Sequence, residues 1–243
     1  ILAAGQGTRM KSDTPKMLHG IGGRTMLEHA LHAARGVDPE QIVAVVGHQR
    51  DKVTEAIAEW VGGQPEESLP NGVAIAHQEE QNGTGHAVQC ALDDATLREF
   101  EGTVLVTTSD VPLLDAETLT ALLEEHNRKP RAAVTVLTST AENPHGYGRI
   151  IRNSDGEVLR IVEEKDATDD ERRTTEVNSG VYAFDAATLR HALTQLNTDN
   201  AQGELYLTDV IGIAREADRS VRGHRLDDSM VVAGVNDRVQ LAT

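Results

Sequence analysis

Short apolar runs alternate with amphipathic stretches along the first 140 residues of the chain. The apolar runs are rich in Val and bounded by Gly or polar residues, which is typical of buried β-strands. The expected strands cover residues 41–47, 72–77, 103–107 and 132–138, and residues 1–3 fit the last part of a strand already under way. Helical periodicity fills the stretches between them, at residues 25–35, 51–61, 84–97 and 115–127. This alternation predicts an α/β fold with a mostly parallel sheet covered by helices.

The pattern changes after about residue 145. Two apolar-alternating segments, 149–152 and 157–163, flank Asn153-Ser154-Asp155-Gly156. Asp-Gly between such segments predicts a β-hairpin. The remaining pattern predicts strands at 177–184 and 221–226, helices at 185–196 and 206–217, and a charged loop or short helix at 166–173.

The composition is that of a soluble globular protein, with 39% hydrophobic and 26% charged residues among 243. No apolar run approaches the ~20 residues that a membrane helix needs. The single cysteine, Cys90, cannot form an intrachain disulfide, which favours a reducing cytoplasm. The N-terminus lacks a signal-peptide pattern, and we expect the first few residues of the natural protein to be missing.

The charge is unevenly distributed. The net charge is −16, which repels DNA, RNA and anionic membranes and excludes nucleic acid and membrane as expected partners. Residues 1–35 nevertheless carry five basic and two acidic side chains, a net charge of +3, and the rest of the chain carries −19. We therefore expect an anion to be held by the N-terminal segment.

A glycine-rich turn follows the first strand, in Leu2-Ala3-Ala4-Gly5-Gln6-Gly7-Thr8-Arg9-Met10. Two glycines let backbone N–H groups approach a phosphate, and Arg9 and Lys16 add positive charge. The spacing is neither that of a Walker P-loop nor that of the dinucleotide fingerprint. An ordinary turn is the alternative, but the basic side chains in an acidic chain favour a phosphate site.

Two candidates follow other expected strands. Asp110 lies past the 103–107 strand, at the sheet edge where ligands bind in open α/β folds. A lone carboxylate there suits magnesium held with substrate phosphates, although a cap or loop aspartate fits equally. Gln78 follows the 72–77 strand and can both donate and accept, as reading a base edge requires.

The loop Asn82-Gly83-Thr84-Gly85-His86 opens the helix expected over 84–97. Thr84 is a candidate contact to a ligand and, as the structural alternative, a candidate N-cap. Gly148, Glu163, Asn178 and Asn236 are weaker candidates, because each also suits a turn, a surface ion pair or a cap.

At these residues the chain resembles a known family. LAAGQGTRM with PKMLH is similar to the signature of sugar-1-phosphate nucleotidyltransferases. GTGHA, NAQGELYLTD and GVNDR are more specific, and together they resemble the uridyltransferase part of the bacterial bifunctional N-acetylglucosamine-1-phosphate uridyltransferases/glucosamine-1-phosphate acetyltransferases. The resemblance runs from Ile1 to Thr243.

The resemblance implies a Rossmann-like nucleotidyltransferase domain over residues 1–243, with a mostly parallel mixed sheet. It implies a nucleotide-binding half at about 1–130 and a hairpin-containing sugar-binding half at 131–243. In the family a longer chain continues into a β-helix domain, which performs the acetyl transfer and forms a trimer. That domain is absent from this chain, which leaves a monomer open.

The resemblance also implies roles for individual residues. The nucleotide is lined by Leu2, Ala3, Ala4 and Gly5, the phosphates meet Arg9 and Lys16, and the uracil contacts Gln78, Gly83 and Thr84. Asp110 and Asn236 hold Mg²⁺, and Gly148, Glu163 and Asn178 bind the sugar. The family has Gly where this chain has Ser109.

The implied reaction is transfer of a uridylyl group from UTP to N-acetylglucosamine-1-phosphate, which gives pyrophosphate and UDP-N-acetylglucosamine for cell-wall precursors. Catalytic roles fall to Arg9, Lys16 and Asp110. The alternatives are a nucleotidyltransferase for another hexose-1-phosphate and a non-catalytic nucleotide-sugar sensor of the same fold. A sensor is expected to lose Lys16 or Asp110, and both are present.

Overall fold

Residues 1–64 and 70–242 are described by a computed structural model of the chain. Residues 65–69 and 243, which belong to the predicted domain, lie outside the described residues. The strands of the sheet are β1 (Leu2–Ala3), β4 (Ile42–Val46), β5 (Val73–His77), β6 (Thr103–Val106), β7 (Val134–Thr140), β8 (Arg149–Arg152), β9 (Val158–Val162), β10 (Glu176–Asp185) and β11 (Val221–Leu226). The α-helices are α1 (Met26–Arg35), α2 (Arg50–Gly62), α3 (Thr84–Asp93), α4 (Ala116–Asn127), α5 (Asp169–Arg172), α6 (Ala186–Leu193), α7 (Asp209–Glu216) and α8 (Arg238–Ala242).

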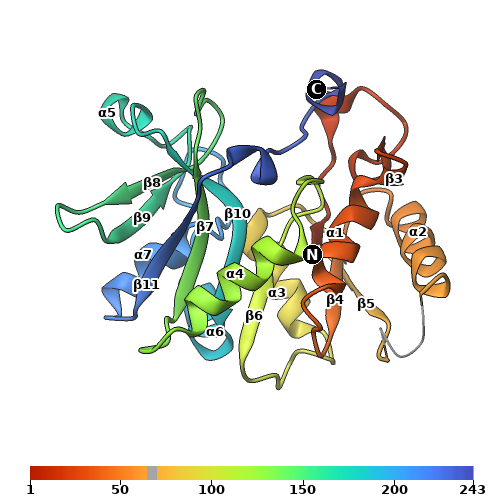
Figure 1. Cartoon of the computed structure of the whole chain (residues 1–243), viewed down its shortest axis with the longest axis horizontal. Helices are drawn as coiled ribbons and strands as arrows, with labels where there is room; N and C mark the ends of the chain where they lie inside the picture. Colours follow the sequence, from red (N-terminus) through yellow and green to blue (C-terminus); the bar gives the residue numbers. More distant parts are fainter. Residues whose placement is uncertain (65–69, 243) are drawn as a thin grey trace.

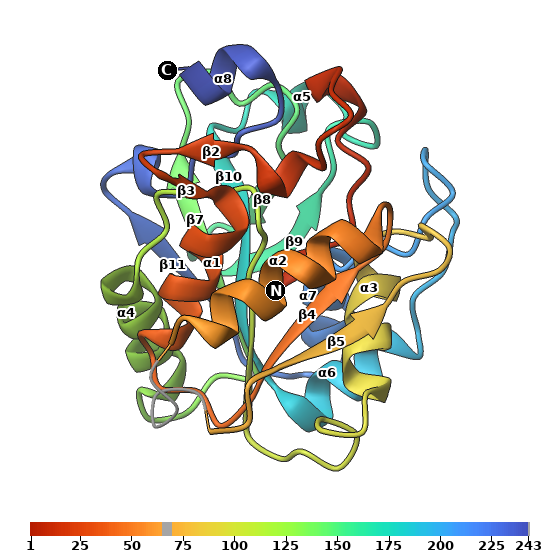
Figure 2. The same ribbon diagram turned by 90° about the vertical axis from the view of Figure 1, so that its right-hand side faces the viewer.

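Apolar side chains alternate between the two faces of the central strands, and this decides where the helices pack. In β10, Val181 and Ala183 join the core under α4, whereas Tyr182 and Phe184 join the core under α3, α6 and α7. β4 divides in the same way between α1 and α2 on one face and α3 on the other. The result is a sheet covered by helices on both faces, with α4 on one side of the strands and α3 and α6 on the other (Figures 1 and 2).

The strands of the N-terminal half run parallel. β1 pairs with β4, and β4 with β5, both in parallel register. A parallel bridge between Leu2 and Thr108 connects β1 to the residues that follow β6. The carboxyl ends of β1, β4, β5 and β6 therefore meet at one edge of the sheet.

The C-terminal half of the sheet is mixed. β10 runs antiparallel to β6, β7 and β8, and β7 pairs in parallel with β11. Because β6 pairs with β10, the two halves of the chain share one continuous set of strands. The register of β10 shifts between Asn178 and Tyr182, where Gly180 has a φ of 80°.

The predicted fold class is confirmed, and the elements differ from expectation at their ends. α3 ends at Asp93 rather than near 97, because Asp94 adopts an extended conformation. α7 begins at Asp209 rather than 206, since residues 204–208 are irregular and bond to other segments. The predicted hairpin is present as β8–β9, with Gly156 at a φ of 81° in its turn.

A small two-stranded ribbon, β2 (Gly20–Ile21) with β3 (Arg24–Thr25), was not expected from the sequence. Its two-residue strands are too short for a periodic pattern. It leads directly into α1, where Thr25 and Glu28 form a capping box. Within residues 1–64 and 70–242, no helix combines the length and apolarity needed to cross a membrane.

Candidate functional site

A cavity of about 280 Å³ opens at the edge of the sheet where the parallel strands end. Eight of the residues singled out in the sequence line it: Leu2, Ala4, Gly5, Lys16, Gln78, Gly83, Thr84 and Asp110. Leu2 lies in β1, and the others come from the segments that follow β1, β5 and β6, because parallel strands present their carboxyl ends together. Ala3 is not among the lining residues; its side chain is buried in the core with α1 and α2.

The conformation of the glycine-rich turn allows Lys16 to pack closely against the backbone of Gly7. Gly7 has a φ of 61°, in the left-handed region that favours glycine. A Cβ at Gly7 would lie 2.4 Å from the Cβ of Lys16, so a larger residue would push this segment away. The turn continues into two 3₁₀ helices, η1 (Thr8–Met10) and η2 (Lys16–Leu18), whose Met10 and Met17 are buried. This packing fixes the position of Lys16.

Four polar side chains from distant parts of the chain converge beside the cavity. Lys16 Nζ donates to Asp110 Oδ2 at 2.6 Å and to Asn236 Oδ1 at 2.9 Å. Arg9 also donates to Asn236 Oδ1, at 3.2 Å. The segment that carries Asn236 is held by the bond from Val235 N to the Asp110 carbonyl oxygen, at 2.8 Å. The C-terminal α8 accordingly lies beside the N-terminal segment (Figures 1 and 2).

Asp110 and Asn236, the expected metal ligands, lie close enough together to hold one cation. A carboxylate oxygen and an amide oxygen already face one cation, the Lys16 ammonium. Two such oxygens suit Mg²⁺, which keeps several waters and takes its remaining ligands from substrate phosphates. In the part of the chain that the structure describes, no cluster of three His, Cys, Asp or Glu residues could hold a metal by itself. The donors present therefore fit a cation shared with a ligand.

Gln78 is buried, and its amide is fixed by the loop that follows β5. Its Nε2 donates to the Gly83 carbonyl oxygen at 3.0 Å and lies 3.2 Å from His86 Nδ1. Gln81, which no sequence pattern marks as a site residue, lines the same cavity and donates to the Ala4 carbonyl oxygen. The loop and the end of β1 are thereby held together around the cavity.

Thr84 does not cap α3, contrary to the structural alternative. Gly83 occupies the N-cap position, and Thr84 is the first helical residue. The Thr84 hydroxyl instead accepts a hydrogen bond from Leu207 N at 3.0 Å. Sequence alone cannot assign a threonine near the start of a helix as its cap, because a backbone N–H from a distant segment can bind the threonine oxygen instead.

The three predicted sugar contacts form a second cluster on β8–β10. A Cβ at Gly148 would lie 3.5 Å from Glu163 Oε2 and 3.6 Å from Asn178 Cβ. Asn178 N donates to the Gly148 carbonyl oxygen at 2.8 Å, and its side chain donates to Tyr182 Oη at 2.7 Å. Burial raises the pKa of Glu163, and a hydrogen bond from Thr208 opposes that increase.

The two groups of residues are neighbours. Gly180 lies two residues beyond Asn178, and a Cβ there would lie 3.4 Å from the Thr108 side chain, which lines the cavity. Ser109 is buried in the cavity wall and donates its N–H to the Leu2 carbonyl oxygen at 3.1 Å. Glu204 also lines the cavity and lies in the quoted motif NAQGELYLTD, which gave the only sequence signal for it.

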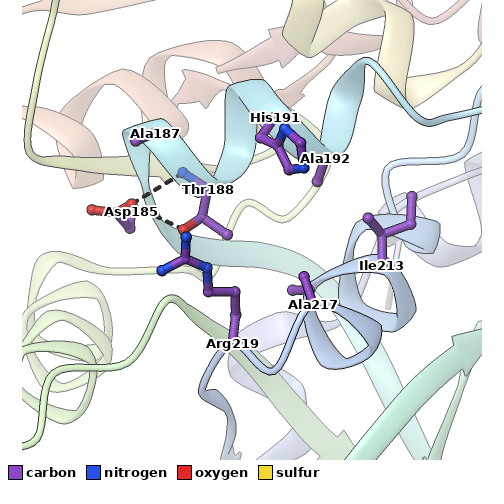
Figure 3. Close-up of a pocket in the computed structure, with 9 residues that line it drawn as sticks. Asp185, Ala187, Thr188, His191, Ala192, Ile213, Ala217 and Arg219 are labelled. Atoms are coloured by element: carbon purple, nitrogen blue, oxygen red, sulfur yellow. Dashed lines mark hydrogen bonds between the residues drawn. The ribbon is translucent and has the colours of Figure 1, made fainter.

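A second, smaller cavity of about 150 Å³ lies between α6 and the end of α7 and contains none of the predicted site residues (Figure 3). Asp185 there accepts hydrogen bonds from the Thr188 backbone and hydroxyl, both at 3.0 Å. The Asp185 carboxylate thus caps α6, whereas the sheet-edge cavity gathers eight of the residues predicted for the site.

A glycine-rich loop, two basic side chains and a carboxylate lie at the carboxyl edge of the parallel strands, an arrangement typical of α/β domains that bind phosphates. The chain belongs to the family of the MobA-like NTP transferase domain, whose model matches residues 1–206.

Curated relatives named "Bifunctional protein GlmU" match the whole chain. Those from Corynebacterium efficiens and Corynebacterium glutamicum are each 60% identical over 242 residues, and that from Rhodococcus opacus is 59% identical over 244. The chain covers 48% of each, so it spans about half the length of these relatives.

Solved structures show the same fold at low sequence identity. A Bacillus anthracis protein assigned as a glucose-1-phosphate thymidylyltransferase gives a TM-score of 0.74 at 19% identity, over 99% of this chain and 90% of its own. A nucleoside-diphosphate-sugar pyrophosphorylase from Vibrio cholerae gives 0.70 at 13% identity, over 98% and 92%.

Proposed function

We propose that this domain transfers a uridylyl group from UTP to N-acetylglucosamine-1-phosphate, releasing pyrophosphate. The observation that carries the proposal is the convergence of Asn236 with Lys16 and Asp110, two residues that line the sheet-edge cavity. It supplies a positive group and two cation-binding oxygens where a triphosphate would enter. The identity of the chain to the GlmU relatives supports this choice of substrates.

Nucleotidyltransferases generally use a divalent metal, and we propose Mg²⁺ held by Asp110 and Asn236. A bound Mg²⁺ neutralises phosphate charge and orients phosphate oxygens. Lys16 Nζ contacts both of these side chains, so a cation held by Asp110 and Asn236 would leave the Lys16 ammonium free to bind phosphate. Arg9, which is exposed and contacts Asn236, is positioned for the outer phosphates.

In this proposal Lys16 and Arg9 align the triphosphate and balance the charge that builds up at the α-phosphorus and the leaving pyrophosphate. The acceptor phosphate is already an anion, so its oxygen attacks without a general base. Catalysis is then alignment and charge neutralisation, as in other phosphoryl-type transfers.

We propose that the base lies against Gln78, Gly83 and Thr84. Gln78 Nε2 donates a hydrogen bond to the Gly83 carbonyl oxygen, so Gln78 Oε1 is left to accept one from a base N–H. Uracil has one ring N–H between two carbonyl oxygens, which suits this single acceptor. The acceptor sugar lies against Gly148, Glu163 and Asn178, so residues 1–130 serve mainly the nucleotide and residues 131–243 mainly the sugar.

Pyrophosphate release from the purified chain tests the proposal. Mixtures of UTP, N-acetylglucosamine-1-phosphate and Mg²⁺ are expected to release pyrophosphate, and omission of any one should abolish it. ATP, CTP, GTP and dTTP are matched alternatives to UTP, and glucose-1-phosphate is the matched alternative acceptor. A preference for another pair would identify a different hexose-1-phosphate nucleotidyltransferase. Binding of UTP without pyrophosphate release would identify a non-catalytic sensor.

A cytoplasmic location and a monomeric state of this chain stay predictions. The first rests on the single cysteine, and size-exclusion chromatography with light scattering measures the second.

A further inference from the structure

Residues 200–208 form a connecting segment that touches both the nucleotide loop and the sugar cluster. The segment begins with a turn that the Asn200 side chain stabilises: it donates to the Glu204 carbonyl oxygen at 2.6 Å and accepts from Glu204 N at 3.2 Å. Gly203 sits in this turn at a φ of 66°. The segment is therefore held in shape by its own hydrogen bonds before it reaches either site.

The middle of the connecting segment pairs with the loop before α3. Leu205 N donates to the Asn82 carbonyl oxygen, and Gly85 N donates to the Leu205 carbonyl oxygen, both at 2.8 Å. Gly83 has a φ of 99°, and a Cβ there would lie 2.6 Å from the Leu205 carbonyl oxygen. Leu207 N also donates to the Thr84 hydroxyl. These contacts explain the two glycines of the Gly83-Thr84-Gly85 motif, because a side chain at either position would collide with the Leu205 backbone.

The end of the segment reaches the sugar cluster. Thr208 is 4% exposed, and its hydroxyl donates to Glu163 Oε1 at 3.0 Å. Glu163 Oε2 is the oxygen that faces Gly148, 3.5 Å from the position of a Cβ there. The Thr208 bond therefore fixes one carboxylate oxygen and turns the other toward the space beside Gly148 and Asn178.

We propose that Thr208 is a positioning residue for the acceptor sugar: it orients Glu163 from a segment that is anchored on the nucleotide loop. The proposal rests on the proposed function for the identity of the acceptor. Thr208 makes no contact with the reacting atoms in this assignment. It acts through Glu163, and the anchoring of residues 205–207 ties the orientation of that carboxylate to the loop at Gly83 and Thr84.

The electrostatic surroundings make the Thr208 hydroxyl important for the charge on Glu163. The acidic groups Asp166, Glu204 and Asp209 and the Tyr182 hydroxyl face this carboxyl from β10, α7 and the loops, and burial and these acids raise its pKa. The Thr208 bond lowers that pKa. Loss of the hydroxyl leaves the carboxylate less ionised and free to rotate.

The chain offers a matched control. Thr188 is also buried, at 9% exposure, and its hydroxyl donates to a carboxylate oxygen of Asp185 at the same 3.0 Å (Figure 3). This pair caps α6, away from the proposed substrate contacts. Thr208→Val and Thr188→Val remove the same type of bond from comparable burial, so their difference isolates the role of Thr208.

The test compares steady-state kinetics of the whole chain and its Thr208→Val, Thr208→Ser and Thr188→Val variants across pH. Thr208→Val is expected to raise the KM for N-acetylglucosamine-1-phosphate by about tenfold, the size of a lost hydrogen bond to a charged group. The KM for UTP should change little, and the acidic limb of kcat/KM for the acceptor should move to higher pH. Thr208→Ser should restore wild-type values, and Thr188→Val should match wild type in both KM values.

An unchanged acceptor KM in Thr208→Val, or an equal change in Thr188→Val, would overturn the proposal. Thr208→Ala, which adds no methyl group, replaces Thr208→Val if thermal melts show that the latter does not fold. A ¹³C NMR titration of the Glu163 carboxyl group, with its signal assigned by comparison with Glu163→Gln, measures the effect of the Thr208 hydrogen bond without requiring turnover. An inactive wild type would count against the proposed function, whereas an unaltered Glu163 titration in Thr208→Val would count against the positioning role.

Discussion

The two regions beside the cavity have opposite electrostatic character. The proposed nucleotide side gathers Arg9 and Lys16 in a segment of net positive charge, although the chain as a whole carries −16. The proposed sugar side gathers acids, with Glu163 half-buried near Asp166 and Asp209. A triphosphate suits the first environment, whereas sugar hydroxyls, which donate hydrogen bonds, suit the second.

The regions also differ in how they are built. The nucleotide side consists of strand ends, glycine turns and backbone groups that lie in short contiguous segments. The proposed sugar side consists of Gly148 just before β8, Glu163 just after β9 and Asn178 in β10, held by a distant connecting segment. The contrast implies that substitutions on the nucleotide side reduce turnover, while those on the sugar side alter recognition of the acceptor.

Removal of the carboxylate at the cation site should have the largest effect. Asp110→Ala is expected to lower kcat about a thousandfold, because it removes the charged ligand proposed for Mg²⁺. Pyrophosphate release at saturating substrates measures this. Asp13→Ala, at an exposed acid of the neighbouring loop, should leave kcat near wild type. Comparable rates in the two variants would remove Asp110 from the reaction.

Lys16→Ala should follow, with a loss in kcat of about a hundredfold. The variant lacks the ammonium that contacts Asp110 and Asn236 and that the proposal assigns to the phosphates. Lys52→Ala serves as the control, because Lys52 is exposed and bonds to Asp13 and Gln49. Thermal unfolding should show that both variants fold, and a Lys16→Ala enzyme with normal kcat would contradict the role assigned to this side chain.

Gly83→Ala should affect both substrates at once. The added Cβ would meet the Leu205 carbonyl oxygen at 2.6 Å, at a φ of 99°, so we expect a loss of about 2 kcal/mol in stability and a higher KM for UTP and for the acceptor. Gly62→Ala is the matched control, since nothing lies within 4 Å of a Cβ there and the residue ends α2. Denaturant unfolding and both KM values distinguish them; a rise in only one KM would show that the regions are independent.

The smallest expected effect is the change in the pH dependence of stability when Glu163 is replaced by Gln. Burial raises the pKa of this carboxyl, so ionisation in the folded protein costs stability once the pH rises above the unfolded pKa. Glu163→Gln should therefore be more stable than wild type at neutral pH, by on the order of 1 kcal/mol, with the difference shrinking as the pH falls. Urea unfolding at several pH values measures this. A wild type that gains stability over the variant with rising pH would reverse the assigned sign.

The contrast between the regions also explains what the sequence could predict. The fold followed from local patterns: β4, β5 and the β8–β9 hairpin appear close to their expected bounds. The nucleotide edge followed from the rule that parallel strands end together, which places Gly5, Gln78 and Asp110 around one cavity.

Other features could not be predicted from local sequence. No spacing rule brings Asn236 to Lys16, 220 positions away, and its placement came from the family resemblance alone. Thr208 lies in the motif NAQGELYLTD, but neither it nor Gln81 could be given a role from sequence, because their contacts with Glu163 and Ala4 exist only after distant segments pack together. Thr84 was open between two roles, and the competing backbone N–H of Leu207 decided against the cap.

The central claim is that the two regions serve one transfer reaction, and the fate of the UTP α-phosphate tests it most directly. The purified chain would be incubated with Mg²⁺, N-acetylglucosamine-1-phosphate and UTP labelled at the α-phosphate. We predict that the label appears in UDP-N-acetylglucosamine, in amounts equal to the pyrophosphate released. Label that stays in UTP, or that appears only in UMP whether or not the sugar phosphate is present, would contradict the claim.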